Sequence, residues 1–81
     1  MNREEIDSGL RGIVSDLLGL EPESIYDNSN FIIDLHADSL DAVEIIMGVE
    51  DHFNIDIADE EAEKSITFSL LANLVESKLK E

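Results

Sequence analysis

The stretch Phe31–Glu44, with the sequence FIIDLHADSLDAVE, decides how this chain is organised. An acidic, irregular segment ends at Asp38, and a long run with apolar residues at helical spacing begins at Ser39. Asp38 and Asp41 are three residues apart, which is the spacing of a capping box at the start of a helix. The sequence therefore predicts a helix over 39–53 with the Ser39 hydroxyl in its first turn, where the helix dipole favours an attached anion.

The predicted helix 39–53 carries two apolar stripes on different faces. The stripe expected to face the core consists of Ala42, Ile46, Val49 and Phe53. The second stripe consists of Leu40, Val43 and Met47. Four acidic residues lie between and beside the stripes: Asp41, Glu44, Glu50 and Asp51. The second stripe is either part of a wide buried face or an exposed apolar strip rimmed by carboxylates, as at a partner-binding surface.

Three further helices are predicted in the rest of the chain. The first covers 3–18, ends at Gly19, and has one apolar stripe: Ile6, Leu10, Ile13, Val14 and Leu17. A short third helix is expected over 59–64, with Asp59 as its cap, and Thr67 is expected to cap a fourth helix over 68–80. No alternating strand pattern competes with these helices, so the predicted fold class is all-α.

Residues 19–38 form a long loop between the first two helices, with turn-forming residues at 27–30. A structureless connection of this length is uncommon in a compact domain and is often functional. Its apolar residues are expected to pin the loop onto the helices: Leu20, Ile25, Phe31, Ile32 and Leu35. The sequence thus predicts one domain over 1–81, a small four-helix bundle with one long loop and a short third helix.

Charge narrows the range of possible partners. The 81 residues include 20 acidic and 5 basic ones, for a net charge of -15, and 15 of the acids lie between Arg11 and Lys64, an interval without Lys or Arg. Such a field repels nucleic acids and anionic membranes and attracts basic protein surfaces. Crowded carboxylates such as those of Asp59, Glu60, Glu61 and Glu63 are expected on average to have raised pKa values, because neighbouring negative charges disfavour ionisation.

Two further absences in the sequence bear on its cellular setting and chemistry. No segment approaches the roughly 20 apolar residues of a membrane-spanning helix, and the N-terminus lacks the apolar core of a signal peptide. A cytoplasmic protein without membrane insertion is therefore expected. The chain has no cysteine, so any thiol chemistry would depend on a prosthetic group.

Taken together, these features closely resemble the acyl carrier proteins. The resemblance covers almost the whole chain, and its matching residues are Phe31, Asp34–Leu35, Ala37–Asp41, Val43–Glu44, Met47, Phe53 and 59–64. It implies a carrier rather than an enzyme, in which Ser39 bears a 4′-phosphopantetheine arm installed from coenzyme A by a phosphopantetheinyl transferase. It also implies that Asp38 helps to hold the metal ion used during that transfer, that the protein has no metal site of its own, and that it is a monomer.

The resemblance implies two further groups of site residues. Residues expected to bind basic-surfaced acyl-transfer and fatty-acid synthesis enzymes are Leu40, Asp41, Val43, Glu44, Met47, Glu50, Asp51, Asp59 and Glu63. Residues expected to line an acyl pocket are Phe31, Ile46, Val49, Ala62 and Leu71. The chain departs from the family pattern at His36, where glycine is usual, so a histidine with a positive φ is a possibility there.

Other functions account for parts of the sequence. A dedicated carrier for polyketide, specialised lipid or aminoacyl groups is the alternative to the fatty-acid type. A serine esterase would need a base, an orienting acid and an oxyanion hole around Ser39, and such esterases have glycine where this chain has Ala37. An acidic DNA mimic would account for the charge but leaves the sequence around Ser39 unexplained.

Overall fold

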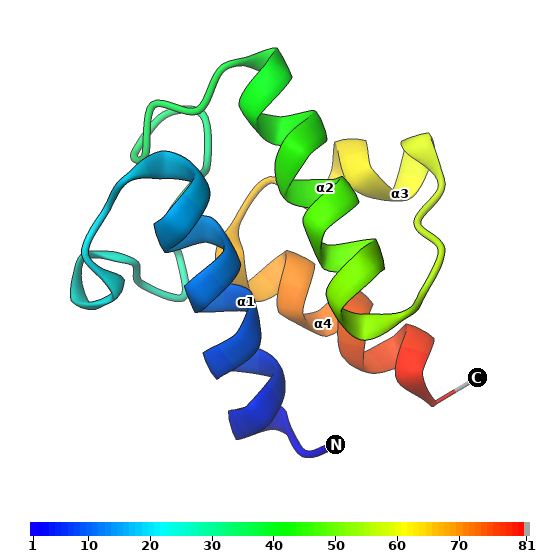
Figure 1. Cartoon of the computed structure of the whole chain (residues 1–81). Coiled ribbons are helices and arrows are strands. Elements are labelled where there is room, and N and C mark those ends of the chain that lie inside the picture. The colour runs from blue at the N-terminus through cyan, green and yellow to red at the C-terminus, as the bar shows by residue number, and fades with distance from the viewer. Residues whose placement is uncertain (81) are drawn as a thin grey trace.

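The computed structural model describes residues 1–80, and these form four α-helices joined by loops (Figure 1). The helices are α1 (Arg3–Leu18), α2 (Ser39–Phe53), α3 (Asp59–Lys64) and α4 (Phe68–Leu79), with a 3₁₀ turn, η1 (Pro22–Ser24), in the long loop. The predicted all-α fold, with its long α1–α2 loop and short α3, is confirmed. The fourth helix ends at Leu79, one residue before the predicted end.

Contacts between near neighbours in the sequence set the helix ends. The carboxylate of Asp38 accepts a hydrogen bond from the Asp41 N–H at 2.8 Å, and that of Asp41 accepts one from the Asp38 N–H at 3.2 Å. The Thr67 hydroxyl caps α4, and Gly19 ends α1 in the left-handed conformation with a φ of 66°. The caps predicted from the sequence at these three places are therefore confirmed. The predicted cap at Asp59 is wrong, because Asp59 is already the first residue of α3 and Ala58 occupies the cap position.

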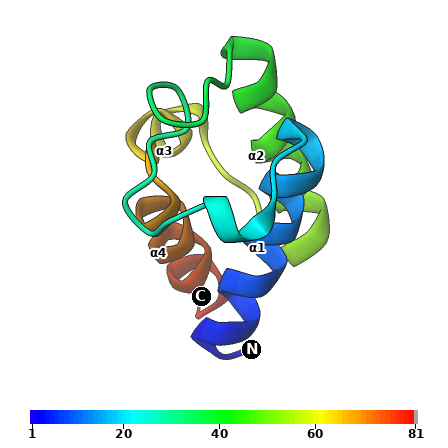
Figure 2. The ribbon, with the colours of Figure 1, turned by 90° about the vertical axis from the view of Figure 1, so that its left-hand side faces the viewer.

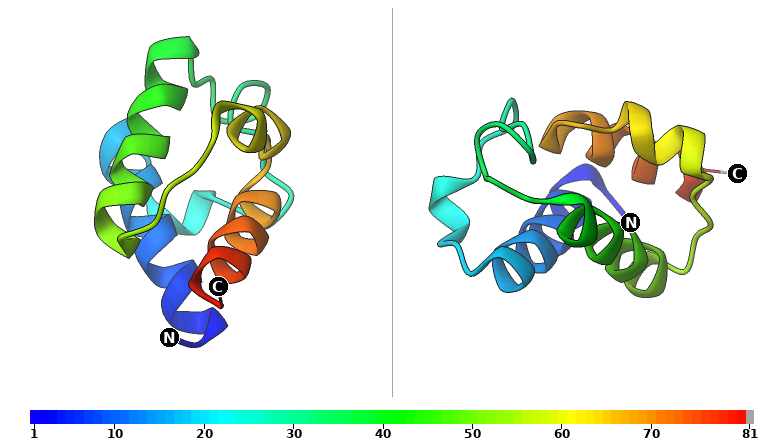
Figure 3. Two further views of the ribbon diagram at one scale, coloured as in Figure 1. Left: turned by 90° about the vertical axis from the view of Figure 1, so that its right-hand side faces the viewer. Right: turned by 90° about the horizontal axis from the view of Figure 1, so that it is seen from above.

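The four helices are arranged as two pairs. α1 packs along α2, α3 packs on α4, and α1 also contacts α4. The two pairs appear as separate layers when the molecule is seen from above (Figure 3, right). α1 and α2 approach closely at two glycines: a Cβ on Gly48 would lie 3.2 Å from Ile13 Cγ2, and a Cβ on Gly9 would lie 3.2 Å from Phe53 Cζ.

The buried core combines residues from α1, α2, α4 and the loops. Its apolar members are Ile6, Leu10, Val14, Ile25, Phe31, Ala37, Ile45, Val49, Phe53, Ile57, Phe68, Leu71, Ala72 and Val75. The predicted core stripe of α2 is partly wrong, because Ile45 is buried whereas Ala42 and Ile46 are half-buried. Leu17 and Ile32 were also predicted to pack inward, but they are 40% and 50% exposed.

The long loop is fastened to the segment that precedes α4. The Phe31 N–H donates to the Ile66 carbonyl, and the Phe68 N–H donates to the Ser29 carbonyl, both at 3.0 Å. Figure 2 shows the loop running along one side of the molecule, from the end of α1 to the start of α2. The N-terminus and the end of α4 lie at the opposite end of the molecule from the start of α2 (Figure 3, left). The loop thereby presents the first turn of α2 at a free end of the bundle.

Candidate functional site

Ser39 is the first residue of α2, and its side chain is exposed. Its hydroxyl takes part in no hydrogen bond with another of the residues 1–80. The N–H groups of Ser39 and Leu40 lie in the first turn, where no preceding turn supplies an acceptor, whereas that of Asp41 is bound by Asp38. A phosphate ester on Ser39 would meet two free N–H groups and the positive end of the helix dipole, so the local chemistry fits a phosphodiester.

The residue three positions before Ser39 has an unusual backbone conformation. His36 has a φ of 60°, in the left-handed region that favours glycine, and its side chain is exposed. The possibility of a positive φ that the sequence raised at this position is therefore realised. A non-glycine residue in this conformation costs roughly 1–2 kcal/mol, with polar side chains such as histidine tolerated better than most.

The two histidines do not form a catalytic arrangement with Ser39. His36 makes no hydrogen bond to the serine, and His52 lies in the last turn of α2, with its ring packed edge-on against Phe53 at a centroid distance of 4.7 Å. A serine nucleophile needs a base within hydrogen-bond reach and an acid that orients the base. Within residues 1–80, Ser39 is therefore exposed and lacks the hydrogen-bonded base that a catalytic serine needs.

The second apolar stripe of α2 is exposed. Leu40, Val43 and Met47 are 66%, 54% and 62% exposed, which decides between the two interpretations that the sequence left open. Four of the carboxylates around it are exposed, namely Glu44, Asp51, Asp59 and Glu63, and two are half-buried, Asp41 and Glu50. The ion pairs seen within residues 1–80 involve other acids: Asp7, Asp27, Glu61 and Glu76. This face is thus an apolar strip in a strongly negative field.

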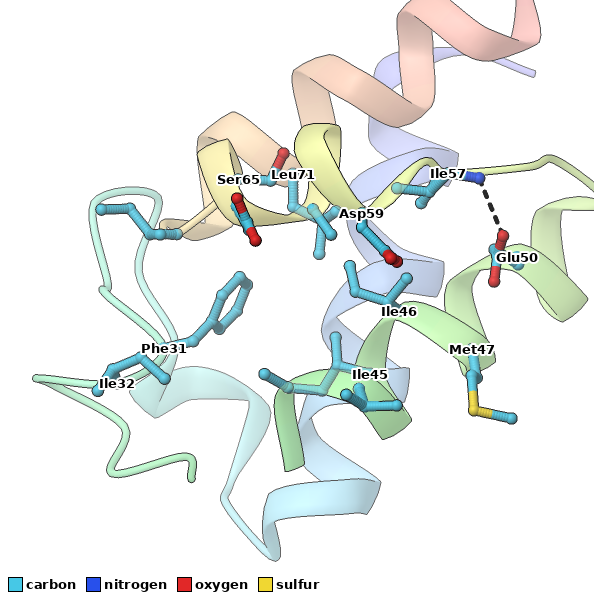
Figure 4. Close-up of a pocket in the computed structure, with 15 residues that line it drawn as sticks. Phe31, Ile32, Ile45, Ile46, Met47, Glu50, Ile57, Asp59, Ser65 and Leu71 are labelled. Atoms are coloured by element: carbon cyan, nitrogen blue, oxygen red, sulfur yellow. Dashed lines mark hydrogen bonds between the residues drawn. The ribbon is translucent and has the colours of Figure 1, made fainter. Parts of the chain in front are cut away.

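A cavity of about 560 Å³ lies between α2, α3 and the long loop (Figure 4). Four of the five residues predicted to line an acyl pocket do line it: Phe31, Ile46, Ala62 and Leu71. The fifth, Val49, does not line the cavity and is fully buried in the core. The volume is within the roughly 300–1,000 Å³ typical of small-molecule sites.

Further residues complete the cavity wall, and sequence reasoning did not assign them to it. They are Ile32, Ala42, Val43, Ile45, Met47, Glu50, Ile57, Asp59, Glu63, Ser65 and Ile66. Ile57 could have been suspected, because it is an apolar residue in an otherwise polar linker. Ala42 is three residues after Ser39, or about 4.5 Å along the helix axis, so the cavity begins close to the exposed hydroxyl.

The cavity exists because α2 belongs to one helix pair and α3 and α4 to the other. α1 packs along α2 and α3 packs on α4, and Ile45 of α2 and Leu71 of α4 line the space between the two pairs. Its lining is mainly aliphatic and also includes the acidic residues Glu50, Asp59 and Glu63. Such a space suits an aliphatic chain that enters from the side of the negative surface.

Glu61 holds α3 to α4 and departs from the charge-crowding prediction. Its carboxylate accepts the Ala58 N–H at 3.0 Å and lies 2.9 Å from the Lys78 ammonium. These two partners hold the pKa of Glu61 below its ordinary value of 4.5, although desolvation acts in the opposite direction. Glu61 is therefore an exception to the rise in pKa that was predicted on average for the crowded carboxylates. Because the unfolded state binds this proton more readily, Glu61 stabilises the fold at neutral pH and ceases to do so as pH falls through the lowered pKa.

None of the helices formed by residues 1–80 combines the length and the apolar character needed to cross a membrane.

Comparison with known proteins gives concordant matches. The family described as "Phosphopantetheine attachment site" matches residues 8–75. The chain is 42% identical over 79 residues to an acyl carrier protein of Thermosynechococcus vestitus, covering 98% of both chains. It is 44% identical over 78 residues to an acyl carrier protein of Picosynechococcus, covering 96% of this chain and 95% of the relative.

Proposed function

The chain belongs to the acyl carrier proteins, and on that premise we propose that Ser39 carries the prosthetic group and that the acyl groups are delivered to enzymes of fatty-acid synthesis. Acyl carrier proteins are carriers rather than enzymes, and their cofactor is covalently attached 4′-phosphopantetheine. The observation that carries the assignment is the exposed, unpartnered Ser39 hydroxyl at the start of α2, next to an apolar cavity.

The 4′-phosphopantetheine, when attached, supplies a terminal thiol that holds an acyl group as a thioester. The chain's own residues would position and shelter it. The N–H groups of Ser39 and Leu40 would bind the phosphate oxygens, and the capping box of Asp38 and Asp41 keeps the first turn of α2 in place. The aliphatic wall of the cavity, including Leu71, would hold the acyl chain away from water.

The exposed strip would be the surface on which partner enzymes dock. Members of this family interact with phosphopantetheinyl transferases and with synthesis enzymes. Leu40, Val43 and Met47 offer apolar contact, and the surrounding carboxylates offer attraction to a basic surface. The carboxylates proposed for this role are Asp41, Glu44, Asp51, Asp59 and Glu63, with Asp38 assigned to the metal ion used by the transferase. Weak, charge-steered binding of this kind lets one carrier exchange rapidly among several enzymes.

The attachment site can be tested by mass spectrometry. Incubation with coenzyme A, Mg²⁺ and a broad-specificity phosphopantetheinyl transferase should add one phosphopantetheine, and peptide mapping should place it on Ser39. Ser39→Ala should abolish the addition and keep the helical circular dichroism spectrum, while Ser77→Ala, which alters another exposed serine, should load normally. Addition at a different serine, or no addition by a competent transferase, would remove the assignment.

The pathway needs a separate test. The loaded protein should accept malonyl and acyl groups and support chain elongation by purified fatty-acid synthesis enzymes. The rate of acyl transfer is compared with the rates measured for polyketide-type and aminoacyl-loading enzymes acting on the same loaded protein. Faster transfer by one of these enzymes than by the fatty-acid enzymes would identify a dedicated carrier and contradict the fatty-acid assignment, with the Ser39 attachment unaffected.

A further inference from the structure

Glu50 differs from the other carboxylates of α2 in what it contacts. It is half-buried, it lines the cavity, and its Oε2 accepts a hydrogen bond from the Ile57 N–H at 2.9 Å (Figure 4). Between these two residues the chain leaves α2 at Asn54, which has a φ of 56°. The Ile57 side chain is buried in the core. Glu50 therefore joins α2 to the linker 54–58 at the edge of the cavity.

This linker controls how α3 is placed relative to α2. α3 is held to α4 through the ion pair of Glu61 with Lys78, and it packs on α4 rather than on α2. The cavity occupies the space between α2 and α3, so few direct contacts set their separation. The Ile55 N–H donates to the Glu50 carbonyl at the start of the linker, and the Ile57 N–H, closer to α3, donates to the Glu50 side chain.

We propose that Glu50 is a positioning residue that holds the α3 wall of the cavity against α2, instead of a docking carboxylate. Without an acceptor at position 50, the part-buried Ile57 N–H loses its partner and the linker opens more often. The α3 wall of the cavity is then held less firmly against α2. The consequence for a bound acyl chain rests on the proposed function, whereas the effect on the linker does not.

The effect on the linker is measured by amide hydrogen exchange of the unloaded protein. Glu50→Ala should raise the exchange rate of the Ile57 amide about tenfold, because a hydrogen bond to a charged acceptor is lost. Glu50→Gln retains an acceptor oxygen and should raise the rate no more than about threefold, since neutral hydrogen bonds are weaker. Asp16→Ala removes one exposed charge from α1, away from the cavity, and should leave this rate unchanged.

Two results of the exchange experiment would overturn the proposal. One is an unchanged Ile57 rate in Glu50→Ala. The other is an equal rise at Ile57 and at the core amides of α1, because this would indicate general destabilisation rather than opening of the linker.

The effect on the carrier is measured with an octanoyl group on the phosphopantetheine arm. Hydroxylamine attacks the thioester carbonyl through nitrogen, the C–S bond breaks, and a hydroxamate and the free thiol result. Glu50→Ala should be cleaved roughly three- to tenfold faster than the wild type, with Glu50→Gln close to the wild type, because the linker restrains the cavity wall. Equal cleavage of all three proteins would refute the positioning role.

The rate at which the transferase attaches phosphopantetheine to each variant distinguishes a positioning role of Glu50 from a docking role. At low salt, a docking role predicts that Glu50→Gln slows the transferase as much as Glu50→Ala does, because both lose the charge. That outcome would overturn the proposal, whereas loading at the wild-type rate in Glu50→Gln supports it. If neither the wild type nor any variant is loaded at Ser39, the proposed function fails. The exchange rate of the Ile57 amide still decides the role of Glu50 in that case.

Discussion

Replacing Leu71 by alanine would test whether the cavity beside α2 holds the acyl chain. Leu71 is fully buried on α4 and forms part of the cavity wall. The substitution removes Cγ and both Cδ atoms, which at about 0.8 kcal/mol for each buried methylene-sized group amounts to about 2.5 kcal/mol of unfolding free energy. Because the removed volume opens into an existing cavity, we expect the lower part of the roughly 2–5 kcal/mol range seen for leucine-to-alanine changes in cores.

Thermal unfolding followed by circular dichroism measures this loss. A domain of this size has a stability of about 4–12 kcal/mol, so the variant should remain folded at low temperature. One kcal/mol corresponds to about 4–8 °C, and the melting temperature of the unloaded protein should therefore fall by about 10–20 °C. The same protein loaded with a long acyl chain should recover part of this loss, because a group that occupies the cavity only in the folded state stabilises that state.

Leu74→Ala is the matched control for this experiment. Leu74 lies on the same helix and packs against the core, but it does not line the cavity. Its substitution should lower the melting temperature by a smaller amount, and acylation should raise the melting temperature no more than it does in the wild type. If acylation restores both variants equally, or neither, the acyl chain does not lie against Leu71 and the assignment of the cavity is wrong.

Three other predictions follow from the exposed strip, from the helix contacts and from α3. Glu44→Lys should slow association with a basic partner enzyme, with a defect that shrinks at high salt, whereas Met47→Ala should weaken binding with little dependence on salt; salt-independent loss in both would refute the charge-steered surface. Gly12→Ala should raise the unfolding free energy by about 0.5–1 kcal/mol, because a Cβ at this position meets nothing within 4 Å. Gly9→Ala should give no such gain, because its Cβ would lie 2.9 Å from the His52 ring nitrogen Nε2, and equal effects of the two substitutions in denaturant titrations would contradict this packing. Glu61→Gln should lower the melting temperature at neutral pH but not in acid below the lowered pKa, where the wild type has lost the same contribution; an equal difference at both pH values would contradict the assigned ion pair.

Local sequence features were sufficient to predict the helices and the exposed position of Ser39 at the start of α2. Asp38 and Asp41 are three positions apart, and the contact between them was predicted from that spacing and is present. The capping role of Thr67 and the helix stop at Gly19 were predicted in the same way. These interactions act within one turn of the chain, so the sequence contains nearly all the information that determines them.

The buried face of α2 could not be read from the sequence in the same way. Apolar residues occur on most of its circumference, so helical spacing alone allowed Ala42 and Ile46 to be placed in the core ahead of Ile45. The choice depends on where α1 and α4 lie. α1 contacts α2 at Gly48, and the cavity leaves Ala42 and Ile46 at its wall.

The sequence by itself determined the all-α class, the helix boundaries to within a residue, the exposed serine and the negative surface, because these depend on neighbours three or four positions apart or on composition. Only the tertiary structure decided the lining of the cavity, the acceptor of the Ile57 N–H and the lowered pKa of Glu61. Glu50 and Ile57 are separated by a helix end, and Glu61 and Lys78 lie on different helices. Their contacts form only when the packing of whole helices brings them together, and no local pattern in the chain records that packing.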